Sequence, residues 1–322
     1  MIKHILVTGG AGFIGSHLVS NLLSTKEWSV SVVDNFNSFY SPDIKRANLE
    51  KHADNENFSL HEVDICDDKG LRSVFEKNKF EAIVHLAARA GVRPSLKAPK
   101  KYAETNVNGT LNLLELARDF EIKQFVFGSS SSVYGERCEV PFSENDRVSK
   151  PISPYAATKI AGEMLCHTYS HLYDFRTICL RFFTVYGACQ RPDLAIHKFA
   201  RLISEGTSIP VFGDGSSKRD YTYIEDIIQG IQLAIEKLSG FEIINLGESR
   251  TIKLIDLISL IENEVGKKAK INFLPFQPGD VEMTYADISK AKRLLGYNPT
   301  FEIEEGIKKF VEWINNSKIA LS

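Results

Sequence analysis

Short runs of apolar, β-branched residues alternate along the chain with longer stretches in which apolar residues recur every three or four positions. The runs cover residues 4–8, 30–34, 59–64, 82–87, 124–129, 177–182 and 242–247. Their length and composition predict β-strands. The spacing of Val107, Leu111, Leu114 and Ala117 is typical of the helices expected between them. Strands that alternate with amphipathic helices form a parallel sheet covered on both faces. The pattern therefore predicts an α/β fold with a doubly wound parallel sheet of about seven strands.

The alternation is regular to about residue 180 and changes beyond it. Connections rich in glycine and proline follow, in VYGACQRPD, IPVFGDGSS and FLPFQPGD. We therefore predict a sheet domain over 1–180 and a smaller C-terminal domain over 181–322. A helical pattern at 224–238 and the apolar run at 242–247 predict that segment 222–247 returns to the sheet of the first domain.

Composition excludes several classes of protein. The 322 residues are 43% hydrophobic and 25% charged, which excludes intrinsic disorder, collagen and coiled coil. The net charge is −2 and no block of like charge occurs, so we expect no nucleic-acid partner. No apolar run approaches the roughly 18 residues of a membrane helix. The start MIKHILVTGG is typical of a strand entering a glycine turn, so we expect no export signal.

The cysteines indicate a reducing compartment. Five are scattered along the chain, and no C-x-x-C pair occurs. They are Cys66, Cys138, Cys166, Cys179 and Cys189. This usage favours free thiols in the cytoplasm over a disulfide framework or a metal site.

A glycine-rich turn follows the first predicted strand. Gly9, Gly12 and Gly15 form G-x-x-G-x-x-G, with Phe13 and Ile14 inside the motif. Glycines at this spacing allow a tight turn, close approach of the backbone to a pyrophosphate, and close packing of the next helix, whose N-terminus faces the phosphates. The context between a strand and a helix predicts a dinucleotide site, the alternative being a purely structural turn.

The second predicted strand ends in Asp34, about 20 residues after the last glycine. A carboxylate there accepts hydrogen bonds from the adenosine ribose and repels a 2′-phosphate, and the following Asn35 and Phe36 provide no arginine to offset that repulsion. We therefore expect NAD rather than NADP. Asp64 and Ile65, after the third strand, are placed to flank the adenine, although a plain turn aspartate is an alternative.

Tyr155 and Lys159 are four positions apart and share one face of a predicted helix. They follow a strand that ends in the run Ser129-Ser130-Ser131-Ser132, and a parallel sheet delivers both segments to its carboxyl edge. A lysine ammonium and an oxidised nicotinamide both favour the phenolate of a tyrosine. Tyr155 is then a candidate base for a hydroxyl proton, with Ser130 as proton relay and Lys159 lowering the pKa of the phenol. The alternative is a core tyrosine beside a surface lysine.

These motifs resemble the extended short-chain dehydrogenase/reductase family. The resemblance rests on TGGAGFIG, HLAARAGVRPS, SSSSVYGE, SPYAATK, LRFFTVYG, RDYTYIEDI and QPGDVEMTYADI, and runs over nearly the whole chain. Within the family the chain is most similar to the NAD-dependent nucleotide-sugar 4-epimerases that act on UDP-glucuronate. The resemblance implies an isomerase, a UDP-sugar substrate and no metal.

The resemblance also implies residue roles. Leu86, Ala87 and Ala88 would line the cofactor channel. Arg219 would bind the UDP diphosphate, a role that suits a cationic bidentate donor. Asp280 would bind the uridine ribose. The helices expected near 98–118 and 154–172 would pair with a second copy, so the resemblance implies a homodimer.

The reaction is indicated by Ser131 and Ser132, which we expect to face the substrate. Decarboxylases and dehydratases that this chain resembles carry acidic residues there, and serine does not act as a general acid or base at neutral pH. The remaining reaction is oxidation at C4, rotation of the ketosugar and return of hydride.

A uronate substrate is indicated by Arg191 and Thr184, whose counterparts in UDP-glucuronate epimerases meet the sugar carboxylate. Arg191, assisted by Thr184 and Arg93, would hold that carboxylate away from the geometry in which a β-keto acid loses CO₂. Other functions stay open: a UDP-N-acetylglucosamine or UDP-glucose 4-epimerase, a UDP-glucuronate decarboxylase, and an NAD-binding regulator without turnover. For Arg191 itself, the alternative is a loop arginine that only pairs with an acidic neighbour.

Overall fold

A seven-stranded parallel sheet forms the centre of the protein. The computed structural model describes residues 2–137, 139–237, 239–277 and 279–317, so predictions that fall on Cys138 and Leu238 lie outside the described residues. The sheet order is β11-β6-β5-β4-β1-β2-β3. Its strands are β1 (Lys3–Thr8), β2 (Trp28–Asp34), β3 (Phe58–Glu62), β4 (Ala82–His85), β5 (Gln124–Ser130), β6 (Arg176–Phe182) and β11 (Phe241–Leu246). All seven expected strands are present, and the predicted fold class is confirmed.

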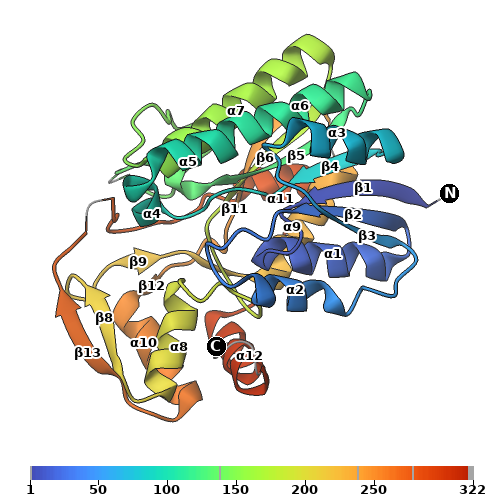
Figure 1. The fold of residues 1–322 in the computed structure, drawn as a ribbon. Helices are drawn as coiled ribbons and strands as arrows, with labels where there is room; N and C mark the ends of the chain where they lie inside the picture. The colour runs from blue at the N-terminus through green and yellow to red at the C-terminus, as the bar shows by residue number, and fades with distance from the viewer. Residues whose placement is uncertain (1, 138, 238, 278, 318–322) are drawn as a thin grey trace.

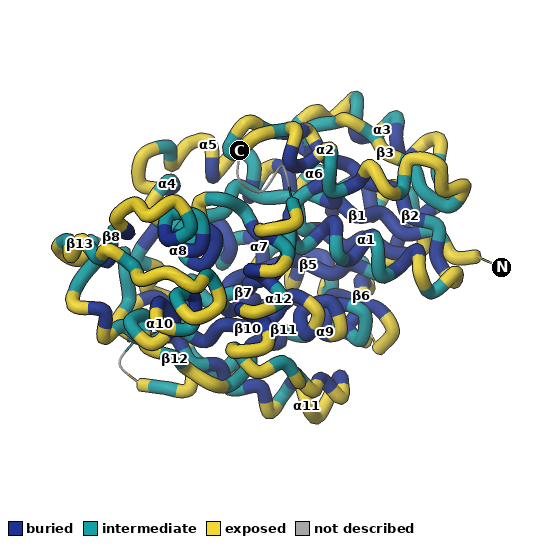
Figure 2. The backbone as a smooth tube through the Cα atoms, turned by 90° about the horizontal axis from the view of Figure 1, so that it is seen from below, coloured by how far each residue is buried: buried dark blue, intermediate teal, exposed yellow. Residues whose placement is uncertain are grey.

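Helices cover both faces of this sheet, as Figure 1 shows. Successive side chains of a strand point to opposite faces. Accordingly, Ile5 and Val7 belong to the cluster that contacts α1 (Phe13–Thr25) and α9 (Ile224–Lys237). Leu6 belongs to a second cluster on the other face. That cluster includes residues of α3 (Asp68–Lys77), α6 (Gly109–Asp119) and α7 (Pro154–Tyr173). The sheet is therefore a buried layer between two helical layers, and its central strands are coloured mostly as buried in Figure 2.

The order in which successive strands join the sheet reverses between β1 and β4, although the two strands are parallel. Both strands are hydrogen-bonded neighbours, with Thr8 opposite His85, yet β2 and β3 extend the sheet on one side and β5, β6 and β11 on the other. In open parallel sheets such a switch leaves a crevice outside the carboxyl ends of the strands, where ligands bind. The ends of β1, β2, β4 and β5 carry the glycine turn, Asp34, Leu86 and Ser130 to this edge.

The remaining elements lie beyond that carboxyl edge or beside the sheet (Figure 1). Two-stranded pairs are formed by β7 (Thr184–Tyr186) with β10 (Tyr221–Tyr223), β8 (Ser208–Phe212) with β13 (Lys270–Leu274), and β9 (Lys218–Arg219) with β12 (Ile252–Lys253). The other helices are α2 (Pro42–Glu50), α4 (Val92–Lys97), α5 (Pro99–Ala103), α8 (Ala195–Ser204), α10 (Leu254–Val265), α11 (Ser289–Leu295) and α12 (Ile303–Asn316). Residues 224–246 return to the sheet as α9 and β11, and β11 pairs with β6. The division into 1–180 and 181–322 stays a prediction.

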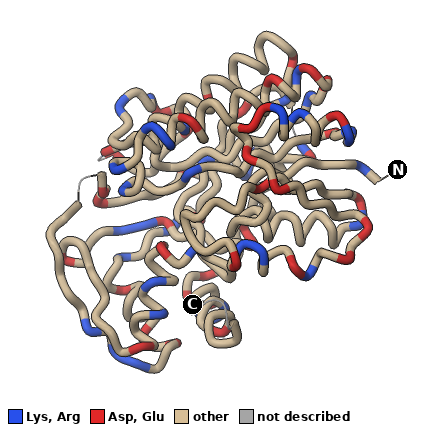
Figure 3. The backbone as a smooth tube through the Cα atoms, in the orientation of Figure 1, with Lys and Arg blue, Asp and Glu red and all other residues tan. Residues whose placement is uncertain are grey.

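Charged residues of both signs are interspersed along the chain, as Figure 3 shows. Within the described ranges, none of the helices combines the length and apolarity that crossing a bilayer requires.

Candidate functional site

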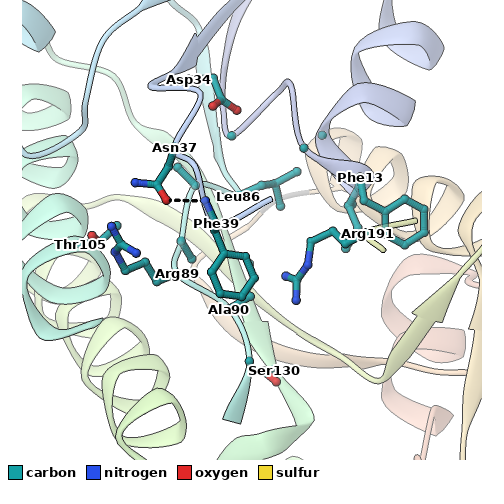
Figure 4. A pocket seen from close by; sticks show the side chains of 18 of the residues that line it. Phe13, Asp34, Asn37, Phe39, Leu86, Arg89, Ala90, Thr105, Ser130 and Arg191 are labelled. Atoms are coloured by element: carbon teal, nitrogen blue, oxygen red, sulfur yellow. Dashed lines mark hydrogen bonds between the residues drawn. The ribbon is translucent and has the colours of Figure 1, made fainter. Parts of the chain in front are cut away.

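A cavity of about 360 Å³ lies at the carboxyl edge of the sheet (Figure 4). The structure brings the residues expected to bind the cofactor together in its wall. They are Gly9, Gly12, Phe13, Ile14, Gly15, Asp34, Asn35, Asp64, Ile65, Leu86, Ala87, Ala88, Tyr155 and Lys159. Ser130, Thr184 and Arg191 line the same cavity. The individual roles of these residues stay predictions.

The glycine turn has the form that a pyrophosphate site needs. Gly9 has φ +71°, and a Cβ on it would lie 2.6 Å from the backbone nitrogen of Ala87. A Cβ on Gly15 would collide with the carbonyl oxygen of Gly9, so this glycine is what brings α1 onto β1. Gly12 precedes the first residue of α1 and lines the cavity. The free N–H groups of the helix start thus face a space that accepts phosphates, and the residues fit NAD.

Asp34 is almost fully buried at the end of β2. Its carboxylate accepts hydrogen bonds from the backbone N–H groups of Ala11, at 3.2 Å, and Phe36, at 2.9 Å. Burial raises the pKa of Asp34, and the ammonium of Lys45 opposes that shift. Asn35 donates to Asp64 at 2.7 Å, which joins the two loops expected beside the adenosine.

Ser130, Tyr155 and Lys159 meet at one end of the cavity. Ser130 is the last residue of β5, and Tyr155 and Lys159 lie in the first two turns of α7. Ser153 caps this helix by accepting a hydrogen bond from the backbone N–H of Ala156. The Lys159 ammonium donates to the carbonyl of Gly128 at 2.6 Å and lies 6.0 Å from the centre of the Tyr155 ring. The three residues predicted to be catalytic therefore line the same cavity, and their roles stay predictions.

Two groups favour the phenolate of Tyr155. Burial raises the pKa of this phenol, while a hydrogen bond with Ser130 and the positive charge of Arg191 lower it. Burial lowers the pKa of Lys159 to about 8, and the carboxylate of Glu163 opposes that shift. The positive charge of Arg191 thus favours the phenolate of Tyr155, and the same role for Lys159 stays a prediction.

A buried ion pair lies directly behind these groups. Arg181 of β6 donates to both carboxylate oxygens of Glu163 at 2.8 Å, and neither side chain is more than 1% exposed. The hydroxyl of Ser129 donates to the same carboxylate at 2.5 Å. The pair thus connects α7, β5 and β6 immediately beside the proposed catalytic residues, a connection that spacing along the chain did not indicate.

A second cavity of about 200 Å³ adjoins the first, because Thr184 lines both. Its wall includes Ser131, Ser132, Arg219 and Asp280, four of the residues expected to bind substrate. The Ser130 hydroxyl donates to that of Ser132 at 3.1 Å. The structure therefore places the predicted substrate side next to the predicted cofactor side.

Arg219 is held by backbone carbonyls, two from the loop at 281–282 and one from the preceding residue of β9. It donates to Val281 at 2.5 Å, to Lys218 at 2.8 Å and to Glu282 at 3.2 Å. Burial lowers the pKa of Arg219, and the carboxylate of Asp280 opposes that shift. These contacts fix the guanidinium in the wall of the second cavity, and its contact with a diphosphate stays a prediction.

The structure places Arg93 differently from the expectation. Its guanidinium pairs with Asp280 at 2.5 Å and lies 4.2 Å from the centre of the Phe212 ring. It lines neither of the two cavities described here, so it does not join Arg191 and Thr184. A contact of Arg93 with the sugar carboxylate stays a prediction that requires this pair to open.

Several residues of the first cavity were missed. They are Asn37, Phe39, Tyr40, Lys45, Arg89 and Thr105. Three of them, Asn37, Phe39 and Tyr40, belong to the segment between β2 and α2, where the aromatic pair at 39–40 was the available signal, and Lys45 lies in α2. Arg89 comes from the loop after β4 and Thr105 from the π-helical segment Glu104–Asn108, and nothing in their local pattern marked them. In the second cavity, Phe142 and Ser153 were missed in the same way.

Comparison with known proteins shows the family. The model of the family described as GDP-mannose 4,6 dehydratase matches residues 6–310. The chain belongs to this family. The resemblance to extended short-chain dehydrogenases/reductases is thereby confirmed. A UDP-glucuronate 4-epimerase of Thermodesulfobacterium geofontis is 45% identical over 311 residues, which cover 96% of this chain and 95% of that protein.

Two solved structures with a similar fold contain bound ligands. UDP-glucuronic acid 4-epimerase from Bacillus cereus, in complex with UDP-glucuronic acid and NAD, has a TM-score of 0.92 and 38% identity and covers 97% of this chain and 99% of its own. UDP-N-acetylglucosamine 4-epimerase from Methanobrevibacter ruminantium M1, in complex with UDP-N-acetylmuramic acid, has a TM-score of 0.89 and 30% identity and covers 97% and 98%.

Proposed function

We propose that the protein is an NAD-dependent isomerase that interconverts UDP-glucuronate and UDP-galacturonate by inverting C4 of the sugar. The observation that carries this proposal is the placement of Arg191 in one cavity with Ser130 and Tyr155. A cation at that point can bind a uronate carboxylate while the phenol reaches the C4 hydroxyl. The predictions of an NAD-dependent UDP-sugar 4-epimerase and of NAD as cofactor are confirmed by the relatives.

Different residues of the protein move the proton, provide a positive charge beside the phenol and hold the diphosphate. Tyr155 takes the proton of the C4 hydroxyl, directly or through Ser130, and returns it after the sugar has turned. Lys159 keeps its ammonium close to the phenol, and Arg219 holds the diphosphate so that the sugar rotates about a fixed end. When bound, NAD⁺ supplies the hydride acceptor at C4 and then the donor to the opposite face. No net oxidation results, so the cofactor has no reason to leave between turnovers.

Arg191 also protects the substrate from a side reaction. Oxidation of C4 gives a β-keto acid, which loses CO₂ when its carboxylate stands perpendicular to the carbonyl plane. A guanidinium that holds the carboxylate closer to that plane suppresses the loss. Thr184, which lines both cavities, is the expected second contact.

A second candidate is 4-epimerisation of UDP-N-acetylglucosamine or UDP-glucose. This candidate is supported by the small side chains in the wall of the second cavity. Ser131, Ser132 and Thr284 leave room there for a larger substituent on the sugar. The family resemblance of the Methanobrevibacter enzyme points the same way. A UDP-glucuronate decarboxylase is less well supported, because serines occupy the positions where acids are expected. A regulator without turnover would not need Ser130, Tyr155 and Lys159 together.

Proton NMR of the products tests the choice of substrate. The purified protein is incubated with UDP-glucuronate, UDP-glucose and UDP-N-acetylglucosamine in parallel. We expect UDP-galacturonate from the first, with much lower turnover of the others. Faster turnover of either neutral sugar would assign the second candidate, and formation of a UDP-pentose by the unaltered protein would assign the decarboxylase.

We also propose a homodimer located in the cytoplasm. Leu111 on α6 and Met164 and Leu172 on α7 are exposed, although their helices belong to the pair expected to meet a second copy. Such apolar side chains on adjoining helices favour association. Cys66, Cys166, Cys179 and Cys189 are free, which favours a reducing compartment. Analytical ultracentrifugation of the protein and of Met164→Glu tests the dimer.

A further inference from the structure

The segment between β2 and α2 places a tyrosine hydroxyl against the glycine turn. The hydroxyl of Tyr40 is buried and finds no hydrogen-bond partner among the described residues. It lies 4.0 Å from the position that a Cβ on Gly12 would take. A buried hydroxyl without a partner loses its hydration and gains nothing in return, so such groups are uncommon unless a ligand completes them.

The surroundings of this hydroxyl favour an anionic ligand. The Lys45 ammonium lies 4.8 Å from the centre of the Tyr40 ring. The positive charge of Arg191 lowers the pKa of Tyr40, but burial outweighs it and raises the pKa above its ordinary value. Tyr40 therefore remains a hydrogen-bond donor at neutral pH. A donor beside two cations and a glycine turn matches a phosphate oxygen.

The segment is braced before any ligand binds. Residues 35–41, here called the strap, begin with Asn35, which donates to Asp64 at 2.7 Å. Lys45 donates to the carbonyl of Asn37 at 2.8 Å. Asn48 of α2 donates to the carbonyl of Ala11 in the glycine turn at 3.0 Å, which ties the helix after the strap to that turn. The position of Tyr40 is thus supported at both ends of the strap.

The strap also reaches the opposite side of the cavity. Phe39 projects into the cavity beside Arg191, whose guanidinium carbon lies 5.2 Å from the centre of the ring (Figure 4). The strap thus extends from Asp34, the expected ribose contact, to the arginine assigned to the sugar. A ligand lying along the cavity would be covered over much of its length.

We propose that the strap, in the position seen here, covers bound NAD and that the Tyr40 hydroxyl donates a hydrogen bond to its pyrophosphate, which retains the cofactor from one turnover to the next. This role rests on NAD as the cofactor and is independent of which sugar the enzyme converts. It would explain how a cofactor held mainly by backbone groups stays in place during the reaction.

The test compares Tyr40→Phe with Tyr186→Phe. The second variant is the matched control, because the Tyr186 hydroxyl is also buried without a partner among the described residues, but it faces Gly306 and not the cavity. Each purified protein is loaded with labelled NAD, and release is followed after a chase of unlabelled NAD. We expect release from Tyr40→Phe to be about 10- to 100-fold faster, the range for a hydrogen bond to a charged group. Release from the control should match that of the unaltered protein.

Two further measurements show whether the variant folds and whether the lost contact is the one with the pyrophosphate. The melting temperature without NAD establishes that Tyr40→Phe folds, and the rise caused by NAD should be smaller in this variant. ADP and adenosine are then used to displace NAD. A pyrophosphate contact predicts weaker ADP binding to the variant and unchanged adenosine binding. Unchanged release of NAD, or equal losses for ADP and adenosine, would overturn the proposal without affecting the assignment of the epimerase.

Discussion

The guanidinium of Arg191 is paired with Asp193, two residues further along the same loop. Its Nε and Nη2 donate to the two carboxylate oxygens at 3.0 and 2.9 Å. The Arg191 side chain is 16% exposed, whereas that of Asp193 is 43% exposed. Asp193 engages one edge of the guanidinium and leaves Nη1 outside the pair. An acidic neighbour was the alternative considered for this arginine, and the pair is compatible with a substrate contact through Nη1.

Replacing Arg191 with alanine should change both affinity and products. The loss of a charge-assisted contact, worth about 1.5–3 kcal/mol, should raise KM for UDP-glucuronate roughly 10- to 100-fold. The 4-keto acid, no longer held, should lose CO₂ and give a UDP-4-keto-pentose with accumulation of NADH. NMR of the products and absorbance of NADH measure the two effects.

The matched control for Arg191 is Arg201→Ala, because Arg201 also pairs with an acidic neighbour but lies on α8, with its partner Glu205 directly after the helix. We expect it to leave the products unchanged. Equal losses with UDP-glucuronate and UDP-glucose in Arg191→Ala, without a pentose, would show that the Arg191–Asp193 pair only shapes the loop.

Tyr155→Phe should remove nearly all turnover and leave NAD bound. The phenol oxygen is the only base proposed, whereas the cofactor contacts the glycine turn and Asp34. Turnover is measured by NMR and NAD content by absorbance of the purified protein. Retention of a tenth of the activity would contradict the role of Tyr155.

Asp34→Ala should weaken NAD binding and relax the discrimination against NADP. The ribose would lose an acceptor and a 2′-phosphate would lose a repelling charge. Lys45 lines the same cavity, and its charge is felt at Asp34, so a cation is already in place for the extra phosphate. Titration of both nucleotides into the variant and the unaltered protein checks this, and an unchanged preference for NAD would contradict it.

Stability should fall in acid because of His85. This residue is buried between Thr8 and Thr110, with ring nitrogens 2.7 and 2.9 Å from their hydroxyls. Burial lowers its pKa to about 3, while the unfolded chain keeps a value near 6.5. Between these values the unfolded state binds the proton and the folded state does not. The folded state therefore loses about 1.4 kcal/mol per pH unit as pH falls below 6.5.

Urea unfolding at pH 7, 5.5 and 4.5 measures this loss. His85→Gln should reduce the slope after correction for its lower stability at pH 7, and His171→Gln, an exposed change on α7, serves as control. An identical slope in all three proteins would assign the acid sensitivity to other groups.

Glu163→Gln should destabilise the protein by about 3–5 kcal/mol, because it leaves the buried guanidinium of Arg181 without its counter-charge. Replacing both members, in Glu163→Leu with Arg181→Met, should cost less than the single change. Removal of the exposed pair between Arg201 and Glu205 should cost less than about 1 kcal/mol. A single change no worse than that surface pair would show that water reaches the Arg181 site.

Local patterns along the chain were sufficient to predict the strands of the sheet and many of the residues that line the first cavity at its carboxyl edge. The inner strands could be predicted from apolar runs, because strands buried on both faces need apolar residues at nearly every position. The edge strand β3, with the sequence FSLHE, has a weaker form of the same pattern. The glycine turn, Asp34, Ser130 and Tyr155 could be placed because each follows or precedes such a strand, and parallel strands deliver their carboxyl ends to one edge.

Contacts between distant segments were decided by tertiary packing alone. Arg93 pairs with Asp280 across 187 positions, so no local pattern could show this partner. The buried pair of Glu163 and Arg181 joins a helix to a strand, and neither residue carries a signal of burial in its own segment. Tyr40 comes to lie beside Gly12 because α2 folds back onto the glycine turn. Periodicity reports which face of an element is apolar, whereas the partner of a polar side chain depends on how the elements are stacked, and only the folded chain contains that information.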